Sequence, residues 1–186
     1  AESFQINNKS IYDVVIENTS FLNITNLSRA FSGTNLSSDK IKELYSLISN
    51  GNETYCGDTF SNDINLKSIV LKGTSNCTAM NGMFNACYNL IFVNNLDTRK
   101  SSNCASMFNN CCRLLKLGDL NLNDCTTMSR MFYECFSLSR VGNLMTTNVK
   151  IMDNLFYNCV SLKKIEGMDF NSVTNVNNMF SGCSSL

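Results

Sequence analysis

Cysteines are the residues of this chain best suited to chemistry, because the sequence contains ten of them and no histidine. Cysteine thiolates can bind zinc, exchange disulfides or act as nucleophiles. No two cysteines have the Cys-x-x-Cys spacing, which argues against a zinc site and against a dithiol redox motif. The absence of histidine also removes the commonest general base at neutral pH. The sequence therefore predicts a protein that is not an enzyme and that needs no metal or cofactor.

Half of the cysteines recur at intervals of 24 residues, and we refer to them as the cysteine ladder. In a stack of repeats these side chains point the same way, which disfavours disulfides between neighbours. We expect buried free thiols that pack in the core. The alternative is that disulfides form, involving Cys77, Cys104 or Cys125. The ladder consists of Cys87, Cys111, Cys135, Cys159 and Cys183.

A row of basic residues at the same interval is the best candidate for a binding site. Lys116, Arg140 and Lys164 each precede an aliphatic residue that should point inward, so these cations should point outward. Phe92 begins the row and Lys163 adds a further charge beside it. Three cations one layer apart repel each other unless an anion lies across them. The row is therefore either a solvated face or a binding site for an anionic partner, such as an acidic glycan or an acidic protein loop.

A strict 24-residue repeat must position these residues. Each unit has phenylalanine followed by cysteine at +3, leucine at +6 and an aliphatic residue at +9, and such repeats stack on one another as a solenoid. We expect an α/β unit with a short strand at the aliphatic position and a short helical or 3₁₀ turn before the phenylalanine. The repeated phenylalanines are Phe60, Phe84, Phe108, Phe132, Phe156 and Phe180, and the strands are expected around Val93, Leu117, Val141 and Ile165.

The repeat divides the chain into a solenoid over residues 56–186 and an N-terminal cap over residues 1–55. The cap contains a degenerate repeat around Phe31 and, after it, a short helix capped by Ser38 or Asp39. The last unit breaks off at Leu186, so its open edge is expected to be continued by more chain or covered by self-association. The residues of the helix that should face the core are Ile41, Leu44, Tyr45 and Ile48.

Composition narrows the range of partners. The chain has 15 basic and 15 acidic residues, so its net charge gives no reason to expect nucleic acid or an anionic membrane. No apolar run approaches the roughly 18 residues that a membrane-spanning helix needs. With 44% hydrophobic residues, the chain can build a core.

The segment Val-Thr-Asn-Val-Asn-Asn-Met-Phe-Ser-Gly-Cys-Ser-Ser-Leu at 173–186 resembles the BspA-like leucine-rich-repeat proteins, in the variant with a Met-Phe-x-x-Cys-x-x-Leu signature. The resemblance covers about residues 55–186 well and 20–50 faintly. It implies a leucine-rich-repeat-like stack in a protein that is extracellular or at the cell surface, often lipid-anchored, and involved in adhesion and host contact. The implied function is a non-enzymatic binding module that presents its strand face to a protein or glycan. Similar repeats in bacteriophage structural proteins imply the alternative, a structural or receptor-binding part of a phage particle or other assembly.

Overall fold

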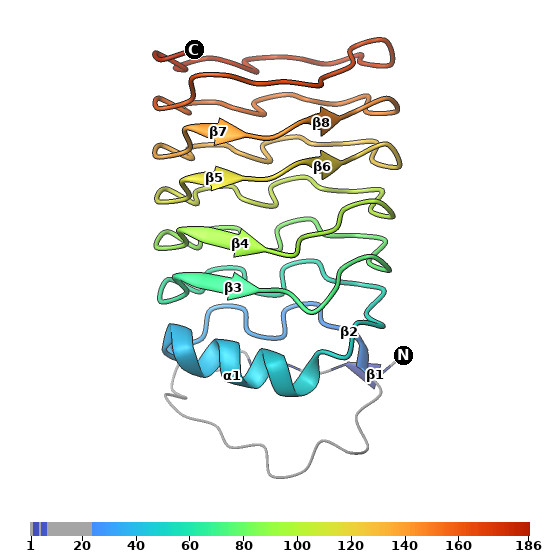
Figure 1. Ribbon diagram of the computed structural model, residues 1–186, viewed down its shortest axis with the longest axis vertical. Coiled ribbons are helices and arrows are strands. Elements are labelled where there is room, and N and C mark those ends of the chain that lie inside the picture. The colour runs from blue at the N-terminus through green and yellow to red at the C-terminus, as the bar shows by residue number, and fades with distance from the viewer. Residues whose placement is uncertain (1, 4, 7–23) are drawn as a thin grey trace.

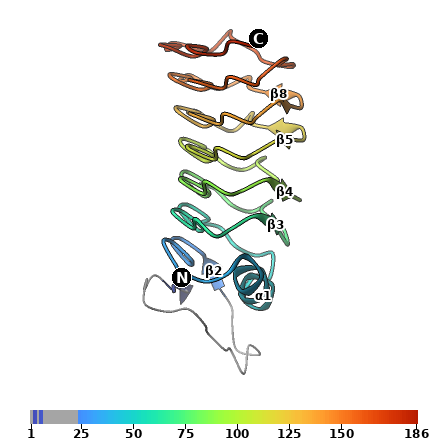
Figure 2. The same cartoon turned by 90° about the vertical axis from the view of Figure 1, so that its left-hand side faces the viewer.

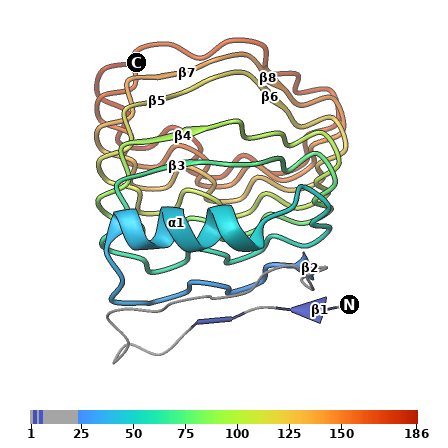
Figure 3. The same ribbon diagram turned by 60° about the horizontal axis from the view of Figure 1, so that its bottom comes forward.

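The computed structural model describes residues 2–3, 5–6 and 24–186. The chain winds into a stack of coils, each one 24-residue repeat long from Phe60 onward, with the helix at one end of the stack (Figure 1). Viewed obliquely from below, the coils are nested flattened rings with α1 beneath β3 (Figure 3). The elements are β1 (Glu2–Ser3), β2 (Ile24–Asn26), α1 (Ser38–Ile48), β3 (Ser68–Val70), β4 (Phe92–Asn94), β5 (Lys116–Leu117), β6 (Leu120–Asn121), β7 (Arg140–Val141) and β8 (Leu144–Met145).

The strands join successive coils in parallel. β3 pairs with β4, β5 with β7 and β6 with β8, and in each pair the opposed residues are 24 positions apart, as in Leu117 opposite Val141. The second strand position, occupied by β6 and β8, was not expected from the sequence. The strand predicted around Ile165 is wrong, because the backbone there makes only an isolated bridge between Asn143 and Glu166.

The prediction of a helical or 3₁₀ turn before each phenylalanine is also wrong. Between Met128 and Cys135, alternate N–H groups donate to carbonyls of the next coil, as Arg130 does to Asp153 at 3.0 Å. From Met131 onward the intervening N–H groups donate to the carbonyl three residues back, as Met131 does to Met128, and the N–H of Ser129 donates to the Thr127 hydroxyl. In a helix every N–H points along the helix axis and bonds within the helix, whereas here half of the N–H groups bond to the next coil. The segment is therefore a ladder of tight turns, and α1 is the helix of the described residues.

Two backbone positions in each coil adopt the left-handed conformation, one two residues before the phenylalanine and one two residues after it. Glycine and asparagine tolerate this conformation best, and their frequency at these positions follows from it. From the Phe31 coil onward the pairs are Arg29 and Gly33, Asp58 and Asn62, Gly82 and Ala86, Ser106 and Asn110, Arg130 and Glu134, Asn154 and Asn158, and Asn178 and Gly182.

We expect the substitution Ser106→Gly to stabilise the protein, because the φ of Ser106 is 56° and a side chain there costs roughly 1–2 kcal/mol. The free energy of unfolding in urea should rise by about 1 kcal/mol. Ser129→Gly is the matched control, since Ser129 is not among the left-handed residues and its replacement should cost about 0.5–1 kcal/mol. A loss of stability in both variants would contradict this account of the turn.

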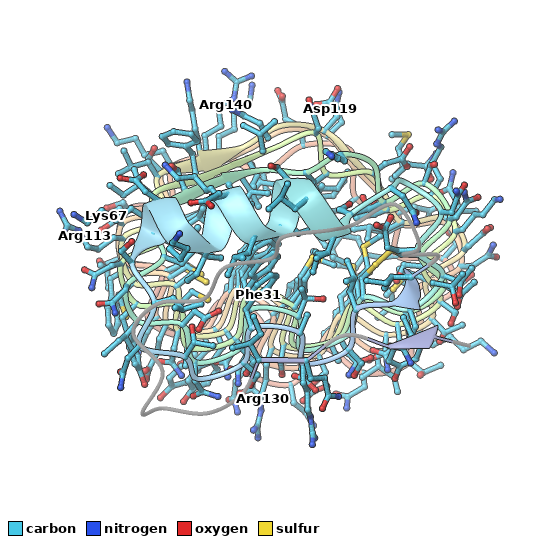
Figure 4. The ribbon with its side chains drawn as sticks, turned by 90° about the horizontal axis from the view of Figure 1, so that it is seen from below. Phe31, Lys67, Arg113, Asp119, Arg130 and Arg140 are labelled. Carbon is cyan, nitrogen blue, oxygen red and sulfur yellow. A yellow bond between two sulfur atoms is a disulfide. The ribbon has the colours of Figure 1, made fainter. Side chains whose placement is uncertain are left out.

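The core is a column of stacked aromatic rings along the axis. From Phe31 to Phe180, neighbouring ring centroids are 5.2–5.8 Å apart and the rings are within 3–8° of parallel. Viewed along the axis, Phe31 lies inside the ring of the coil, whereas the labelled charged side chains lie on its outer side (Figure 4). Phe31 and Phe60 stack like the later pairs, so the degenerate coil continues the same column.

The helix α1 closes the lower end of the strand face (Figure 2). Its buried residues are the four predicted from the sequence, including Tyr45, whose ring packs 5.5 Å from that of Phe60. The predicted cap is wrong: Ser37, rather than Ser38 or Asp39, is the N-cap, and its hydroxyl accepts a hydrogen bond from the Lys40 N–H at 3.2 Å. Residues 7–23 of the predicted N-terminal cap lie outside the described residues.

Candidate functional site

A pocket on the strand face brings together three residues that the sequence singled out. Phe92 on β4, Lys116 on β5 and Arg140 on β7 come from three successive coils and line a space of about 310 Å³. Arg140 projects outward from the same edge of the coil as Asp119 (Figure 4). The other lining residues are Val93, Asn94, Leu117, Gly118, Asp119 and Gly142.

The two-residue period of a strand places these side chains. Val93, Leu117 and Val141 point into the core and are at most 8% exposed. The residue before each of them therefore faces solvent, and the ring of Phe92 is 42% exposed. Parallel pairing sets Lys116 directly opposite Arg140, so the two cations lie one coil apart and line the same pocket.

The other two predicted binding residues are not among those that line the pocket. Lys164 forms an ion pair with Glu166, and this bond holds the pKa of the Glu166 carboxyl below its usual range. Lys163 is exposed on the same coil. Lys116 and Arg140, by contrast, form no ion pair with any residue that the structure describes. Of the row of three cations expected from the sequence, with Lys163 beside it, two line the pocket.

Asp119 is the pocket residue that the sequence did not reveal. Its Oδ1 accepts a hydrogen bond of 2.8 Å from the N–H of Asn143 on the next coil. Glycine at position 142 permits this contact, because a Cβ there would lie 2.3 Å from the same Oδ1 and 2.6 Å from the backbone nitrogen of Asp119. In the sequence, Gly118-Asp119 indicates only a turn. The pocket therefore combines two cations, one fixed carboxylate and one half-exposed aromatic ring.

A family model described as "Mycoplasma protein of unknown function, DUF285" matches the chain over residues 2–116, 54–163 and 78–186. The chain belongs to the DUF285 family. These overlapping matches together span residues 2–186 and so include all of the repeats. No curated protein matches this sequence.

This DUF285 chain is similar in fold to a leucine-rich repeat protein from Bacteroides ovatus ATCC 8483, known from a crystal structure. The TM-score is 0.50 and the sequence identity is 21%, over 74% of this chain and 40% of the other. At this identity the likeness shows a leucine-rich-repeat fold and nothing about activity. The chain spans two-fifths of the length of that relative.

The cysteine ladder of this DUF285 protein forms a row of hydrogen bonds that the sequence did not predict. Each thiol donates to the carbonyl of the phenylalanine 27 residues earlier, at 2.9–3.1 Å, as Cys135 does to Phe108. Burial raises the pKa of the Cys87, Cys111 and Cys135 thiols well above the ordinary value and that of Cys159 to about 12. Because the thiolate is the reactive form, these thiols are poor nucleophiles at neutral pH.

One disulfide, Cys56–Cys77, lies outside the cysteine ladder, whose five members are free thiols as expected. It is an instance of the alternative in which Cys77 takes part in a bond. The Cα atoms of the two cysteines are 5.9 Å apart, within the range that a disulfide allows. The two residues belong to different columns of adjacent coils, so their side chains can meet, whereas ladder cysteines occupy one column and point the same way.

Metal sites and membrane-spanning helices are both absent from the described part of the chain. No group of three or more histidine, cysteine, aspartate or glutamate residues there could hold a metal ion. No helix among the residues that the structure describes has the length and apolar character to cross a membrane.

Proposed function

We propose that this protein is a non-enzymatic binding module whose strand-face pocket takes an acidic glycan on a host or neighbouring cell surface. One observation carries the proposal. Three successive coils place Phe92, Lys116 and Arg140 around a single space of about 310 Å³, and neither cation is paired with a described acidic residue.

The chemistry of the pocket matches an acidic sugar. The planar guanidinium of Arg140 suits a carboxylate or sulfate, which it can hold by two parallel hydrogen bonds, and Lys116 adds a point charge beside it. The exposed face of Phe92 offers an apolar surface for the sugar ring. Asp119, held by Asn143, keeps a carboxylate oxygen that can accept a hydrogen bond from a sugar hydroxyl.

Two features support an extracellular or cell-surface location. Disulfides such as Cys56–Cys77 persist mainly in oxidising compartments outside the cytosol. The repeats also resemble those of BspA-like surface proteins, which implies adhesion. No feature of the described residues favours the alternative role in a phage particle or other assembly, and self-association through the last coil stays a prediction.

We expect the double variant Lys116→Ser/Arg140→Ser to bind acidic glycans about 5- to 30-fold more weakly than the wild type, since the two exposed charge pairs together contribute about 1–2 kcal/mol. Binding should first be found on an array of sulfated, carboxylated and neutral glycans and then measured by titration. The wild-type affinity should fall as salt is raised, because salt screens exposed charges.

The matched control is Arg113→Ser/Arg130→Ser, which also removes two cations but on other sides of the coil (Figure 4). It should bind like the wild type. Equal losses in the two double variants, or no acidic glycan bound by the wild type, would overturn the proposal. Capture of an acidic peptide without any glycan would assign the pocket to a protein partner instead.

A further inference from the structure

Cys104 and Cys125 are related to each other in the same way as the two cysteines of the disulfide. Cys56 lies four residues before the phenylalanine of its coil, and Cys77 lies seven before the phenylalanine of the next coil. Cys104 and Cys125 repeat both positions two coils further along the stack. In each pair the sequence separation is 21 residues.

The backbone around the two pairs has the same register. The N–H of Cys56 donates to the carbonyl of Ala79 at 3.1 Å, and the N–H of Cys104 donates to the carbonyl of Thr127 at the same distance. In both cases the acceptor lies two residues beyond the second cysteine. A backbone frame that accommodates a disulfide in the first pair therefore also surrounds the second pair, Cys104 and Cys125.

The two thiols lie close enough to interact electrostatically, and both residues are fully buried. In the structure both are free thiols: Cys104 donates to the Ser101 hydroxyl at 3.4 Å, and Cys125 donates to the Thr127 carbonyl at 3.0 Å. The interaction with Cys104 lowers the pKa of the Cys125 thiol below its ordinary value. Ladder thiols donate to carbonyls of the preceding coil, whereas Cys104 and Cys125 donate to groups only two or three residues away in the sequence.

The remaining coils between Phe84 and Phe180 do not carry two cysteines at these positions. A second disulfide of this geometry can therefore form at one place in that part of the stack. The equivalent pairs are Met80 with Ser101, Met128 with Val149, and Met152 with Val173.

We propose that Cys104 and Cys125 form a second disulfide that clips adjacent coils, as Cys56–Cys77 does. The oxidant is a disulfide of the thiol–disulfide oxidoreductase or oxidised-glutathione class. The Cys125 thiolate attacks one sulfur of that disulfide and releases the other as a thiolate. The Cys104 thiolate then attacks Sγ of Cys125 and releases the second thiolate. Two electrons pass from the protein to the oxidant, and the two thiol protons end on its two released sulfurs.

Because both cysteines are buried in the folded stack, the disulfide must form at an earlier stage, during folding. At that stage these coils are still open, whereas neither sulfur is accessible in the folded stack. Once formed, it is shielded from reductants in the same way.

Counting thiols tests the proposal. The protein is refolded in a glutathione redox buffer, quenched with acid, denatured and titrated with a thiol reagent. With two disulfides, six of the ten cysteines remain free. The double variant Cys56→Ser/Cys77→Ser should also have six free thiols, since it keeps only the second bond. Cys104→Ser/Cys125→Ser is the control with six free thiols from the first bond alone. Eight or ten free thiols in the wild type would overturn the proposal.

Peptide mapping of the wild type shows whether the two segments are linked, and two single variants identify the cysteine in the link. Trypsin releases Cys125 in the peptide 117–130, which contains no other cysteine, and Cys104 in the peptide 101–113. Under non-reducing conditions we expect these two peptides to be linked. The link should persist in Cys112→Ser and disappear in Cys104→Ser, because the peptide 101–113 also contains Cys111 and Cys112. Finding 117–130 unlinked, or linked through another cysteine, contradicts the assignment.

Discussion

Replacement of Phe132 by alanine is expected to lower the free energy of unfolding by about 3–5 kcal/mol, the usual cost of removing a buried phenylalanine. Phe132 is fully buried, and its ring lies between those of Phe108 at 5.7 Å and Phe156 at 5.2 Å. The substitution removes the ring and both stacking contacts and leaves a cavity on the axis. Denaturation in urea, followed by circular dichroism, measures the loss.

The position in the stack should determine the size of this effect. Each coil contacts only its neighbours, so a break at Phe132 separates the coils on its two sides. Phe180→Ala is the matched control, because that ring is 40% exposed and stacks on Phe156 alone. We expect the control to lose about half as much stability or less. Equal losses at the two positions would show that the aromatic column does not couple the coils.

The aromatic column was predictable because every coil must bury the same side chains at the same place. Phenylalanine, cysteine and leucine at a fixed period predict a stack of coils, because only stacking buries every copy of each residue in the same way. In the structure the phenylalanines stack and the cysteines bond between coils. The alternation of inward and outward residues on the short strands follows from the same pattern. This alternation in the sequence predicts that Phe92, Lys116 and Arg140 share one face, and in the structure they line one pocket.

The turns and the fine structure of the site were not predictable in the same way. Arg130 and Glu134 adopt left-handed backbone although neither residue favours it, because N–H groups directed at the next coil require it. The apolar spacing of that segment instead suggested a helix. Asp119 joins the pocket through a hydrogen bond to the following coil, and Lys164 is engaged by Glu166. Such contacts depend on the geometry of the loops between coils. The repeat pattern shows which residue types recur at each position but not how these loops are arranged.

Asp63 should make the stability of the protein fall as pH rises. It occupies the ladder position of its coil, where its Oδ1 accepts hydrogen bonds from the N–H and hydroxyl of Thr34 at 3.0 and 2.9 Å. The other carboxyl oxygen is buried without a partner. Burial raises the pKa of Asp63 to about 8, despite the two bonds from Thr34. The folded protein therefore keeps this proton at pH values where the unfolded chain, with a pKa of about 4, has lost it.

Between about pH 4 and about pH 8 the folded state binds more protons than the unfolded state. The contribution of Asp63 to the free energy of unfolding is therefore fully present below about pH 4 and is lost as the pH rises to about 8. The loss amounts to roughly 1.4 kcal/mol for each pH unit in the window. Urea denaturation at a series of pH values measures this slope.

Asp63→Asn should remove that slope, because asparagine keeps the oxygen that accepts from Thr34 and cannot ionise. Its amide N–H groups lack an assured acceptor, so the absolute stability at acid pH should drop while the stability at pH 8 approaches or exceeds that of the wild type. Asp124→Asn is the control, since Asp124 is exposed and its replacement should leave the wild-type slope intact. If Asp63→Asn retains the slope, the proton is held elsewhere, and the carboxylate of Asp63 is ionised in the folded coil.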